Sequence, residues 1–539
     1  MNSMKKVYHY VLICLAGSVL SCSDYLNTKP VSFTTIDNFY KTPDDIQIAL
    51  RGCYGRLINS YSVNSRAGLF FVGDIGTDEL IGNPYSTPDA SSNMDQFIFG
   101  RVVKTNRMTH DLWENMYRSI YTINLLLSKL DEVNMDHNQR MQVEGEAMFL
   151  RGWHYMYLGM IYGGVPVYTS VPHEMDRPRN TLREVMEQSI ADLQFAYDNL
   201  GDAKVAGAAN KWTAGGYLAK LYCYLASSKK FDAGRQLGFA LNSFDWVDTD
   251  KYYTNAKQIL NDIITVSGYS LAADYRTLFC EGSTARQDKE NLLAVLPSKE
   301  NKSGFAPTYY LYPVGFYGHG WGTCRPTQEV YDRYDTTYDA RVHWVVGGLG
   351  TDAGTETIDG MRYYKPLALA ISNGVAYDGD YNVTKIRLLS SSNIDFYYGH
   401  YPLLRLADIY LLLAEATAHL EGDEAGREIL KAVRSRALIT SRSTDVDVLQ
   451  TAYRRSDFIQ ELLDERSREL CFEQQRKFDL VRFGRYVSTI HELSTARGVW
   501  NSLVARILID NITESDIWLP VPEEDEISNP NLLPNNPGY

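Results

Sequence analysis

Residues 144–168, EGEAMFLRGWHYMYLGMIYGGVPVY, contain a helix that has to be covered by other helices. Apolar residues recur in this segment at steps of three to five, and aromatic residues spread around its other faces: Ala147, Leu150, Trp153, Leu158 and Ile161, with Tyr155, Tyr157 and Tyr162. A helix with so much apolar surface is stable only when its neighbours bury it. Gly163, Gly164 and Pro166 then end it, because glycine adopts backbone angles that other residues avoid and proline has no N–H to donate. The segment therefore predicts a protein built mainly from packed helices.

The spacing within this helix recurs twice later in the chain. Each copy has a leucine, then a small residue, and three positions later a residue with a polar tip: Tyr155-x2-Leu158-Gly159-x2-Tyr162, Gly215-x2-Leu218-Ala219-x2-Tyr222 and Tyr410-x2-Leu413-Ala414-x2-Thr417. This order is typical of the first helix of a tetratricopeptide repeat, in which the small residue lets the neighbouring helix approach closely. The copies do not follow the regular period of ~34 residues, so long insertions must separate them. We expect a mostly α fold, a tetratricopeptide-like helix-pair scaffold with long loop and short-strand insertions.

The same periodicity predicts further helices at 42–57, 112–130, 181–200, 212–225, 403–420, 424–437 and 457–486. The last of these carries acidic and basic residues at spacings that allow ion pairs along one helix: Glu461, Asp464, Glu465, Arg466, Arg468 and Glu469. Such a mixture predicts a face in contact with solvent. The tail from Pro520 is rich in proline and asparagine and is expected to be extended.

Residues 280–400 differ in kind from the helical segments. Their helical periodicity fades and glycine and aromatic residues become frequent, which predicts loops with short strands. Within fourteen residues of this region lie Tyr309, Tyr310, Tyr312, Phe316, Tyr317 and Trp321, together with four glycines and a proline. An aromatic ring pairs with the apolar C–H face of a sugar while nearby polar groups bind its rim, so at least one of these rings is expected to contact ligand. The alternative for any single ring is that it fills the core beneath the loop.

The first residues carry a targeting signal. Lys5 and Lys6 precede an apolar stretch from Val7 to Leu20 that is too short to span a bilayer comfortably. The sequence Val19-Leu20-Ser21-Cys22 resembles the lipobox of bacterial lipoproteins, in which the cysteine becomes the acylated first residue; the alternative is an ordinary secretory signal. We expect a signal at 1–21, lipidation at Cys22, a polar tether at 22–34 and a membrane-anchored mature chain. Cleavage removes two lysines and no acid, so the formal charge changes from −13 to −15, which argues against nucleic acid as a partner.

The remaining chemistry-bearing residues form no familiar catalytic motif. The chain lacks a Gly-x-Ser-x-Gly elbow, a His-Glu-x-x-His helix, a P-loop and a dinucleotide-binding glycine pattern. Glu465 and Glu469 would be a conceivable glycosidase pair, but on a charged helix we expect them to face solvent or to pair with arginine. His154 is expected to pack, and Asp378-Gly379-Asp380-Tyr381-Asn382 to form a polar turn rather than a calcium loop, because Val383 and Leu389 replace the required glycine and glutamate. We expect no metal and no cofactor.

The cysteines indicate neither a disulfide framework nor a zinc site. Besides Cys14 and Cys22, five scattered cysteines remain, an odd number without a Cys-x-x-Cys pair: Cys53, Cys223, Cys280, Cys324 and Cys471. The expected role is that of buried small apolar residues, with one disulfide left open in an exported protein.

Four separated motifs resemble the SusD/RagB family of surface lipoproteins of Gram-negative bacteria, and they occur in the family's order. They are TIDNFYKTPDDIQIALRGCYGRL, EAMFLRGWHYMYLGMIYGGVPV, ELLDERSRELCFEQQRKFDLVRFG and the terminal LPVPEEDEISNPNLLPNNPGY. The resemblance implies one α-helical body over residues 35–539, built on four helix pairs, with a ligand face inserted at about 280–400. It also draws attention to the early loop 78–93, where Asn83 and Tyr85 are flanked by glycine and proline.

The resemblance also implies a function at the outer membrane. Family members are lipid-anchored at the cell surface, bind oligosaccharides or, less often, peptides, and lie over the mouth of a SusC-type TonB-dependent transporter; they are not enzymes. The expectation is thus a glycan-binding lipoprotein that delivers its ligand to such a transporter. A peptide-binding relative on the same scaffold and a surface glycoside hydrolase are the two alternatives.

Overall fold

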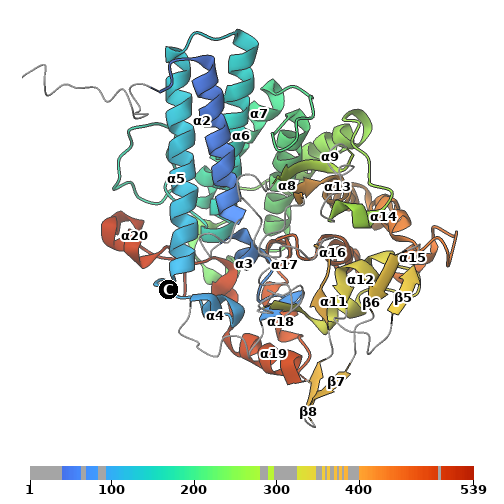
Figure 1. Cartoon of the computed structure of the whole chain (residues 1–539). Coiled ribbons are helices and arrows are strands. Elements are labelled where there is room, and N and C mark those ends of the chain that lie inside the picture. Colours follow the sequence, from blue (N-terminus) through green and yellow to red (C-terminus); the bar gives the residue numbers. More distant parts are fainter. Residues whose placement is uncertain are drawn as a thin grey trace, which may run out of the picture.

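The computed structural model is a bundle of helix pairs carrying a region of short strands (Figure 1). It describes residues 39–61, 68–82, 93–279, 289–296, 324–347, 355–358, 361–364, 369–372, 375–378, 381–386, 400–495 and 499–539. Cys22 and the expected signal and tether lie outside this part of the chain. Among the helices described, none has both the length and the apolar character needed to cross a membrane.

Four pairs of antiparallel neighbours form the scaffold. They are α2 (Pro43–Tyr61) with α5 (Arg107–Lys129), α6 (His137–Tyr162) with α7 (Leu182–Asn199), α8 (Lys211–Lys230) with α9 (Thr249–Val266), and α13 (Leu406–Glu421) with α14 (Asp423–Ala437). Consecutive pairs also touch, through α5 and α6, α7 and α8, and α9 and α13. Figure 1 shows α2, α5 and α6 side by side, with the later pairs following in order. The predicted helix-pair scaffold is confirmed.

Small residues set how closely these helices pack. A Cβ added at Gly159 would lie 2.6 Å from Cε of Met186 in the partner helix α7. One added at Gly215 would lie 2.8 Å from the ring of Tyr197 in α7 and 3.1 Å from Ile259 in α9. In the fourth pair, Gly426 of α14 approaches Ala414 of α13, where an added Cβ would lie 2.8 Å from the Ala414 carbonyl oxygen. Gly159 is the small residue of the first copy of the repeated spacing, and Ala414 is that of the third, so these two close approaches give the spacing a physical reason.

Helix α6 is buried on all sides over its second half, as its sequence predicts. Trp153, Tyr155, Tyr157 and Tyr162 are each at most 1% exposed. The buried hydroxyls have partners, since Tyr155 donates to the carbonyl oxygen of Tyr168 at 2.8 Å and Tyr162 to that of Thr109 at 2.8 Å. His154 is also buried, with Nδ1 2.6 Å from the Leu150 carbonyl oxygen, and burial lowers its pKa to about 4. Its expected packing role is confirmed.

The described strands form five antiparallel pairs, most of them in the region predicted to hold short strands. They are β1 (Leu80–Gly82) with β3 (Cys324–Pro326), β2 (Asn291–Val295) with β10 (Tyr401–Arg405), β4 (Val346–Gly347) with β9 (Asn382–Val383), β5 (Thr355–Ile358) with β6 (Met361–Tyr364), and β7 (Leu369–Ser372) with β8 (Val375–Asp378). Short helices accompany them: α3 (Leu69–Gly73), α4 (Asn93–Ile98), α11 (Gln328–Asp332), α12 (Ala340–Val345) and α15 (Val448–Ala452).

The prediction of one helix over 457–486 is wrong. The segment forms α16 (Phe458–Leu470), α17 (Arg476–Arg482) and the start of α18 (Tyr486–His491). The first break contains Phe472 and Gln474 at φ values of 63° and 65°, and the Gln474 N–H donates to Asp74 at 2.7 Å. A carboxylate distant in sequence therefore supports a left-handed turn that no glycine marks.

Two further boundaries differ from the predicted ones. Residues 401–405 form a strand before α13 begins, and the tail contains a short helix, α20 (Glu523–Ser528), instead of being extended throughout. Helices α9 and α19 (Val499–Asn511) were not predicted. The described cysteines, Cys53, Cys223, Cys324 and Cys471, are free and buried, which confirms their role as small apolar residues; Cys280 lies outside the described residues.

Gly163 offers a test of how α6 ends. Its φ of 77° and ψ of −136° lie where side chains are strained, and an added Cβ would lie 2.2 Å from Nδ2 of Asn242, whose Oδ1 accepts the Gly164 N–H at 2.8 Å. Gly163→Ala is expected to lower the free energy of unfolding by about 2–4 kcal/mol. Gly52→Ala in α2, where an added Cβ meets nothing within 4 Å, is expected to raise it by about 0.5–1 kcal/mol. Chemical unfolding measures both, and equal effects would contradict this account.

Candidate functional site

The two segments that hold the predicted ligand residues each border one small sheet. Asn83, Tyr85, Tyr309, Tyr310, Phe316, Tyr317 and Trp321 lie outside the described residues, and their contacts stay predictions. The described residues at the ends of their segments are placed, however. Gly82, which precedes segment 83–92, is the register partner of Cys324, which follows segment 297–323. Two segments far apart in the sequence therefore join the body at neighbouring points.

Strand β1 is packed tightly against the helix to which segment 83–92 returns. A Cβ added at Gly82 would lie 1.8 Å from Cγ2 of Ile98 in α4, so only glycine allows this approach. Segment 83–92 thus leaves from β1 and re-enters at an element in contact with β1. We call β1, β3 and α4 the platform.

A buried carboxylate fixes the platform to the rest of the body. Arg476 donates from Nε and Nη2 to the two oxygens of Asp78 at 2.8 and 2.7 Å, and Arg333 also donates to Asp78 Oδ2. Burial acts to raise the pKa of Asp78, but the charges of Arg333 and Arg476 outweigh it and hold that pKa well below its ordinary value. Thr327, which follows β3, donates from its hydroxyl to the Asp78 carbonyl oxygen at 2.5 Å. Asp78 is therefore ionised and joins both strands of the platform to α17.

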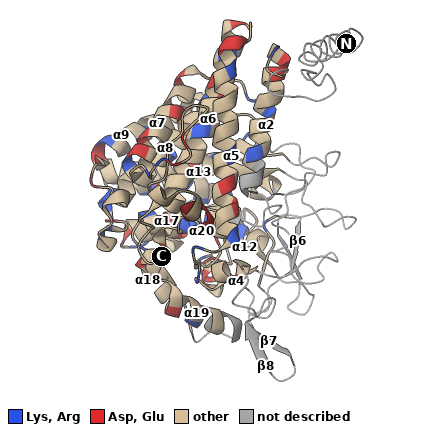
Figure 2. Ribbon diagram, turned by 90° about the vertical axis from the view of Figure 1, so that its left-hand side faces the viewer, with Lys and Arg blue, Asp and Glu red and all other residues tan. Residues whose placement is uncertain are grey.

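The charged face of α16 lies in the interior, so the prediction that it faces solvent is wrong. Glu461, Glu465 and Glu469 are fully buried, and acidic and basic residues are interspersed along the described helices (Figure 2). Nη1 of Arg341 donates to Glu465 at 2.8 Å and to Glu469 at 2.9 Å, and Nη1 of Arg405 donates to Glu290 at 3.0 Å. Arg434 adds contacts to Glu461 at 3.0 Å and to Glu465 at 2.8 Å. We call these arginines and glutamates the buried ion network: Arg341, Arg405 and Arg434 with Glu290, Glu461, Glu465 and Glu469.

This network removes Glu465 and Glu469 as a glycosidase pair. A general acid needs a raised pKa and access to the sugar. Burial acts to raise the pKa of Glu469, but Arg436, Arg405 and Arg341 together lower it to about 2. Arg468, Arg341 and Arg434 likewise outweigh burial and hold the pKa of Glu465 well below its ordinary value. Both groups are ionised, arginine-paired and out of contact with solvent, which confirms the arginine pairing that the sequence left as one option.

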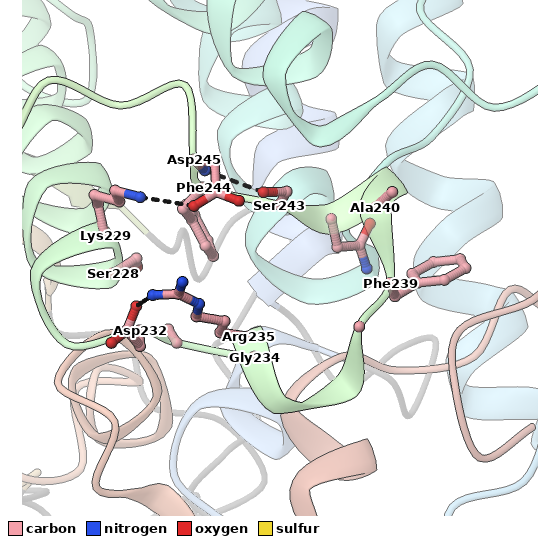
Figure 3. Close-up of a pocket in the computed structure, with 13 residues that line it drawn as sticks. Ser228, Lys229, Asp232, Gly234, Arg235, Phe239, Ala240, Ser243, Phe244 and Asp245 are labelled. Carbon is pink, nitrogen blue, oxygen red and sulfur yellow. Dashed lines mark hydrogen bonds and ion pairs between the residues drawn. The ribbon is translucent and has the colours of Figure 1, made fainter.

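Two other clusters are of chemical interest. A polar pocket of about 280 Å³ lies beyond the end of α8, and its charged side chains pair with one another, Lys229 with Asp245 at 2.7 Å and Arg235 with Asp232 at 2.8 Å (Figure 3).

At the start of α5, ligand atoms of His110, Asp111 and Glu114 lie within 4.8 Å of one another, close enough to hold a metal ion. This group does not follow any familiar metal-binding motif in the sequence. In the segment from Asp378 to Asn382, which is expected to form a polar turn, residues 379–380 lie outside the described residues.

Removing one cation from the buried ion network tests its energetic importance. Arg341→Met leaves Glu465, Glu469 and Asp339 without a shared partner in the interior, and we expect it to lower the free energy of unfolding by about 3–5 kcal/mol. The matched control is Arg454→Met, which breaks an exposed pair with Glu424 and should change stability by about 0.5 kcal/mol or less. Urea unfolding compares the two, and an Arg341 variant as stable as the control would contradict the importance of the network.

The network also predicts acid sensitivity. Carboxylates whose folded pKa is depressed stabilise the fold above their ordinary pKa of about 4, and this contribution is lost as the pH falls through the folded value. With the pKa of Glu469 at about 2 and that of Glu465 also lowered, the Tm should fall steeply between about pH 4 and pH 2. Calorimetric scans across this range measure the effect. A Tm that is constant from pH 5 to pH 2.5 would show that these pairs contribute little.

Two family models match separate parts of the chain. The model of the SusD family matches residues 289–539, and the model described as "Starch-binding associating with outer membrane" matches residues 80–223. SusD-like protein P2 of Formosa agariphila is 26% identical over 568 residues, which cover 99% of this chain and 100% of that protein. Starch-binding protein SusD of Bacteroides thetaiotaomicron is 32% identical over 138 residues, 26% of this chain and 21% of that protein.

Solved structures share the architecture. A SusD homolog from Bacteroides thetaiotaomicron superposes with a TM-score of 0.72 at 18% identity, covering 94% of this chain and 98% of that chain. A structure determined with xylogluco-oligosaccharide superposes with a TM-score of 0.66 at 20% identity, covering 92% and 99%. At such identities these structures show the fold. The two family models, over residues 80–223 and 289–539, and the relatives that match along nearly the whole length show that the chain is similar throughout to proteins of the SusD/RagB family.

Proposed function

We propose that this chain is a surface lipoprotein that binds oligosaccharides and delivers them to a TonB-dependent outer-membrane transporter. We call residues 297–323 the aromatic segment. The observation that carries the proposal is the register of β1 and β3, which joins the early loop and the aromatic segment to the body at one edge. Relatives support the ligand class, since one is named a starch-binding protein and one neighbour was solved with xylogluco-oligosaccharide.

Binding in this proposal is noncovalent. Rings of the aromatic segment stack on the C–H faces of the sugar, and polar tips such as Asn83 bind its hydroxyls. The loops need a base that does not move, because the energy of a few stacking contacts is lost when they are poorly oriented. Asp78 with its two arginines, and Gly82 pressed on Ile98, provide that base.

In this proposal, the cellular setting is inferred from the N-terminal sequence and from the similarity to the SusD family. Acylation of Cys22 anchors the chain in the outer membrane, and residues 22–34 let the body stand away from the lipid surface. A SusC-type transporter is the partner in this proposal, and one matching family model is described as associating with the outer membrane. No catalytic step is assigned.

Replacing two rings of the aromatic segment tests the proposal. Tyr317→Ala with Trp321→Ala should weaken binding of the recognised polysaccharide at least about tenfold, since each lost stacking contact is worth roughly 0.5–1.5 kcal/mol beyond the buried area. Trp246→Ala, a half-buried tryptophan before α9, is the control and should bind as the wild type does. Affinity electrophoresis and calorimetry with glycan and peptide panels give the measurement.

Three results would contradict the proposal or part of it. Binding that is unchanged in the double variant would reject the aromatic segment as the site. Binding of peptides and of no glycan would favour the peptide-binding alternative. Release of reducing sugar that disappears when a single carboxylate is replaced would favour a glycoside hydrolase.

A further inference from the structure

A groove outside the two predicted loops is lined by aromatic rings from separate parts of the chain. It has a volume of about 550 Å³ and lies between α5, the segment from Gly163 to Asn180, and the end of the chain around α20. Volumes of about 300–1,000 Å³ are usual for small-molecule sites. Its rings are Trp113, Tyr117, Tyr121, Tyr168 and His173. We call it the aromatic groove.

The rings form one continuous wall. Tyr168 lies against His173 with ring centroids 4.1 Å apart and planes inclined by 31°, and Tyr121 meets His173 in an edge-to-face arrangement with ring centroids 5.9 Å apart. Tyr117 contacts Tyr168 at 5.8 Å and Trp113 at 4.9 Å. Tyr121 is 43% exposed, so the wall reaches solvent.

Hydrogen bonds behind the wall hold the rings in place. The Tyr117 hydroxyl donates to the Pro166 carbonyl oxygen at 2.8 Å. The Tyr168 carbonyl oxygen accepts from the hydroxyl of Tyr155 at 2.8 Å and from Nδ2 of Asn124 at 2.9 Å, both on helices of the scaffold. A ligand therefore meets rings that are already ordered, which lowers the entropy cost of binding.

Polar groups of the kind that bind sugar hydroxyls surround the wall. Glu114 and Arg118 pair with each other at 2.5 Å, and Asp525, Ser528 and Asn529 line the opposite side. His173 Nδ1 is buried and has no hydrogen-bond partner among the described residues. Asp525 Oδ2 is also buried and lies 3.7 Å from Nε2 of His110. A buried ring nitrogen without a partner is uncommon in proteins, and a sugar hydroxyl satisfies it after a small rotation of the His173 side chain. Burial raises the pKa of Asp525 to about 6.

We propose that the aromatic groove binds a neutral sugar unit of the same polysaccharide at a second position; this rests on the proposed function. The ring wall matches the apolar face of a pyranose, and the groove holds one or two such units. The carboxylates of Glu114 and Asp525 repel acidic sugars, and the cation of Arg118 is paired with Glu114. A long glycan then has two contacts on one protein, which raises its apparent affinity through effective concentration.

The variants Tyr121→Ala and His173→Ala test the groove, with Tyr121→Phe as the conservative control and Ile48→Ala as an exposed control on α2. Each is combined with the wild-type loop and with the Tyr317→Ala and Trp321→Ala double variant. Affinity electrophoresis is run in gels containing the polysaccharide that the wild type binds. We expect each groove variant to bind roughly three- to tenfold more weakly, to abolish the binding left in the loop variant, and to unfold at the wild-type temperature.

The outcomes separate the groove from the loops. If the wild type binds a glycan and the groove variants bind it equally well, the groove inference is overturned and the proposed function stands. If the wild type binds no glycan in the panel, both are overturned. If the groove variants keep their glycan affinity but no longer co-purify with the coexpressed transporter, the groove is a protein-docking surface, to which the exposed Met175 and Ile527 would contribute, and the sugar inference is overturned.

Discussion

One carboxylate, that of Glu469, joins the main parts of the molecule. Its oxygens accept from Arg341 in α12 at 2.9 Å, from Arg405 in β10 at 2.5 Å and from Arg436 in α14. Each of these groups would be costly to bury alone, and only good geometry with many partners makes the burial tolerable. The network thereby fixes residues 324–347 on the helical scaffold. This region includes the start of β3, which directly follows the aromatic segment.

Scaffold and binding surfaces depend on different physical terms. The helix pairs are held by apolar packing at close approach, as at Gly159 and Gly426, and the aromatic residues in the second half of α6 are buried. The platform lies where the repeat is interrupted, whereas the aromatic groove lies between α5, the segment that joins α6 to α7, and the end of the chain. A rigid body whose insertions carry the contacts allows the ligand to change without loss of the core.

The sequence predicts the helices well because periodicity is local. It predicts the placement of charges poorly, because Glu461, Glu465 and Glu469 have the same spacing whether they face water or arginines. Arg341 and Arg405, which both donate to Glu469, are 128 and 64 residues away from it along the chain. The break at Phe472 and Gln474 escapes detection for the same reason, since its support comes from Asp74. The aromatic groove combines Tyr117, Tyr168 and Asp525, which no spacing rule connects. The roles of Tyr317 and Trp321 stay predictions.

The central claim is that the early loop and the aromatic segment form one glycan site on the platform. The most direct measurement is photo-crosslinking of the wild type with a diazirine-bearing oligosaccharide of the recognised glycan, followed by mass spectrometry of the labelled peptides. The account predicts adducts in both segment 83–92 and segment 297–323, each suppressed by excess unlabelled glycan, because Gly82 and Cys324 are register partners. Labels confined to other parts of the chain, or to one of these segments alone, would contradict it.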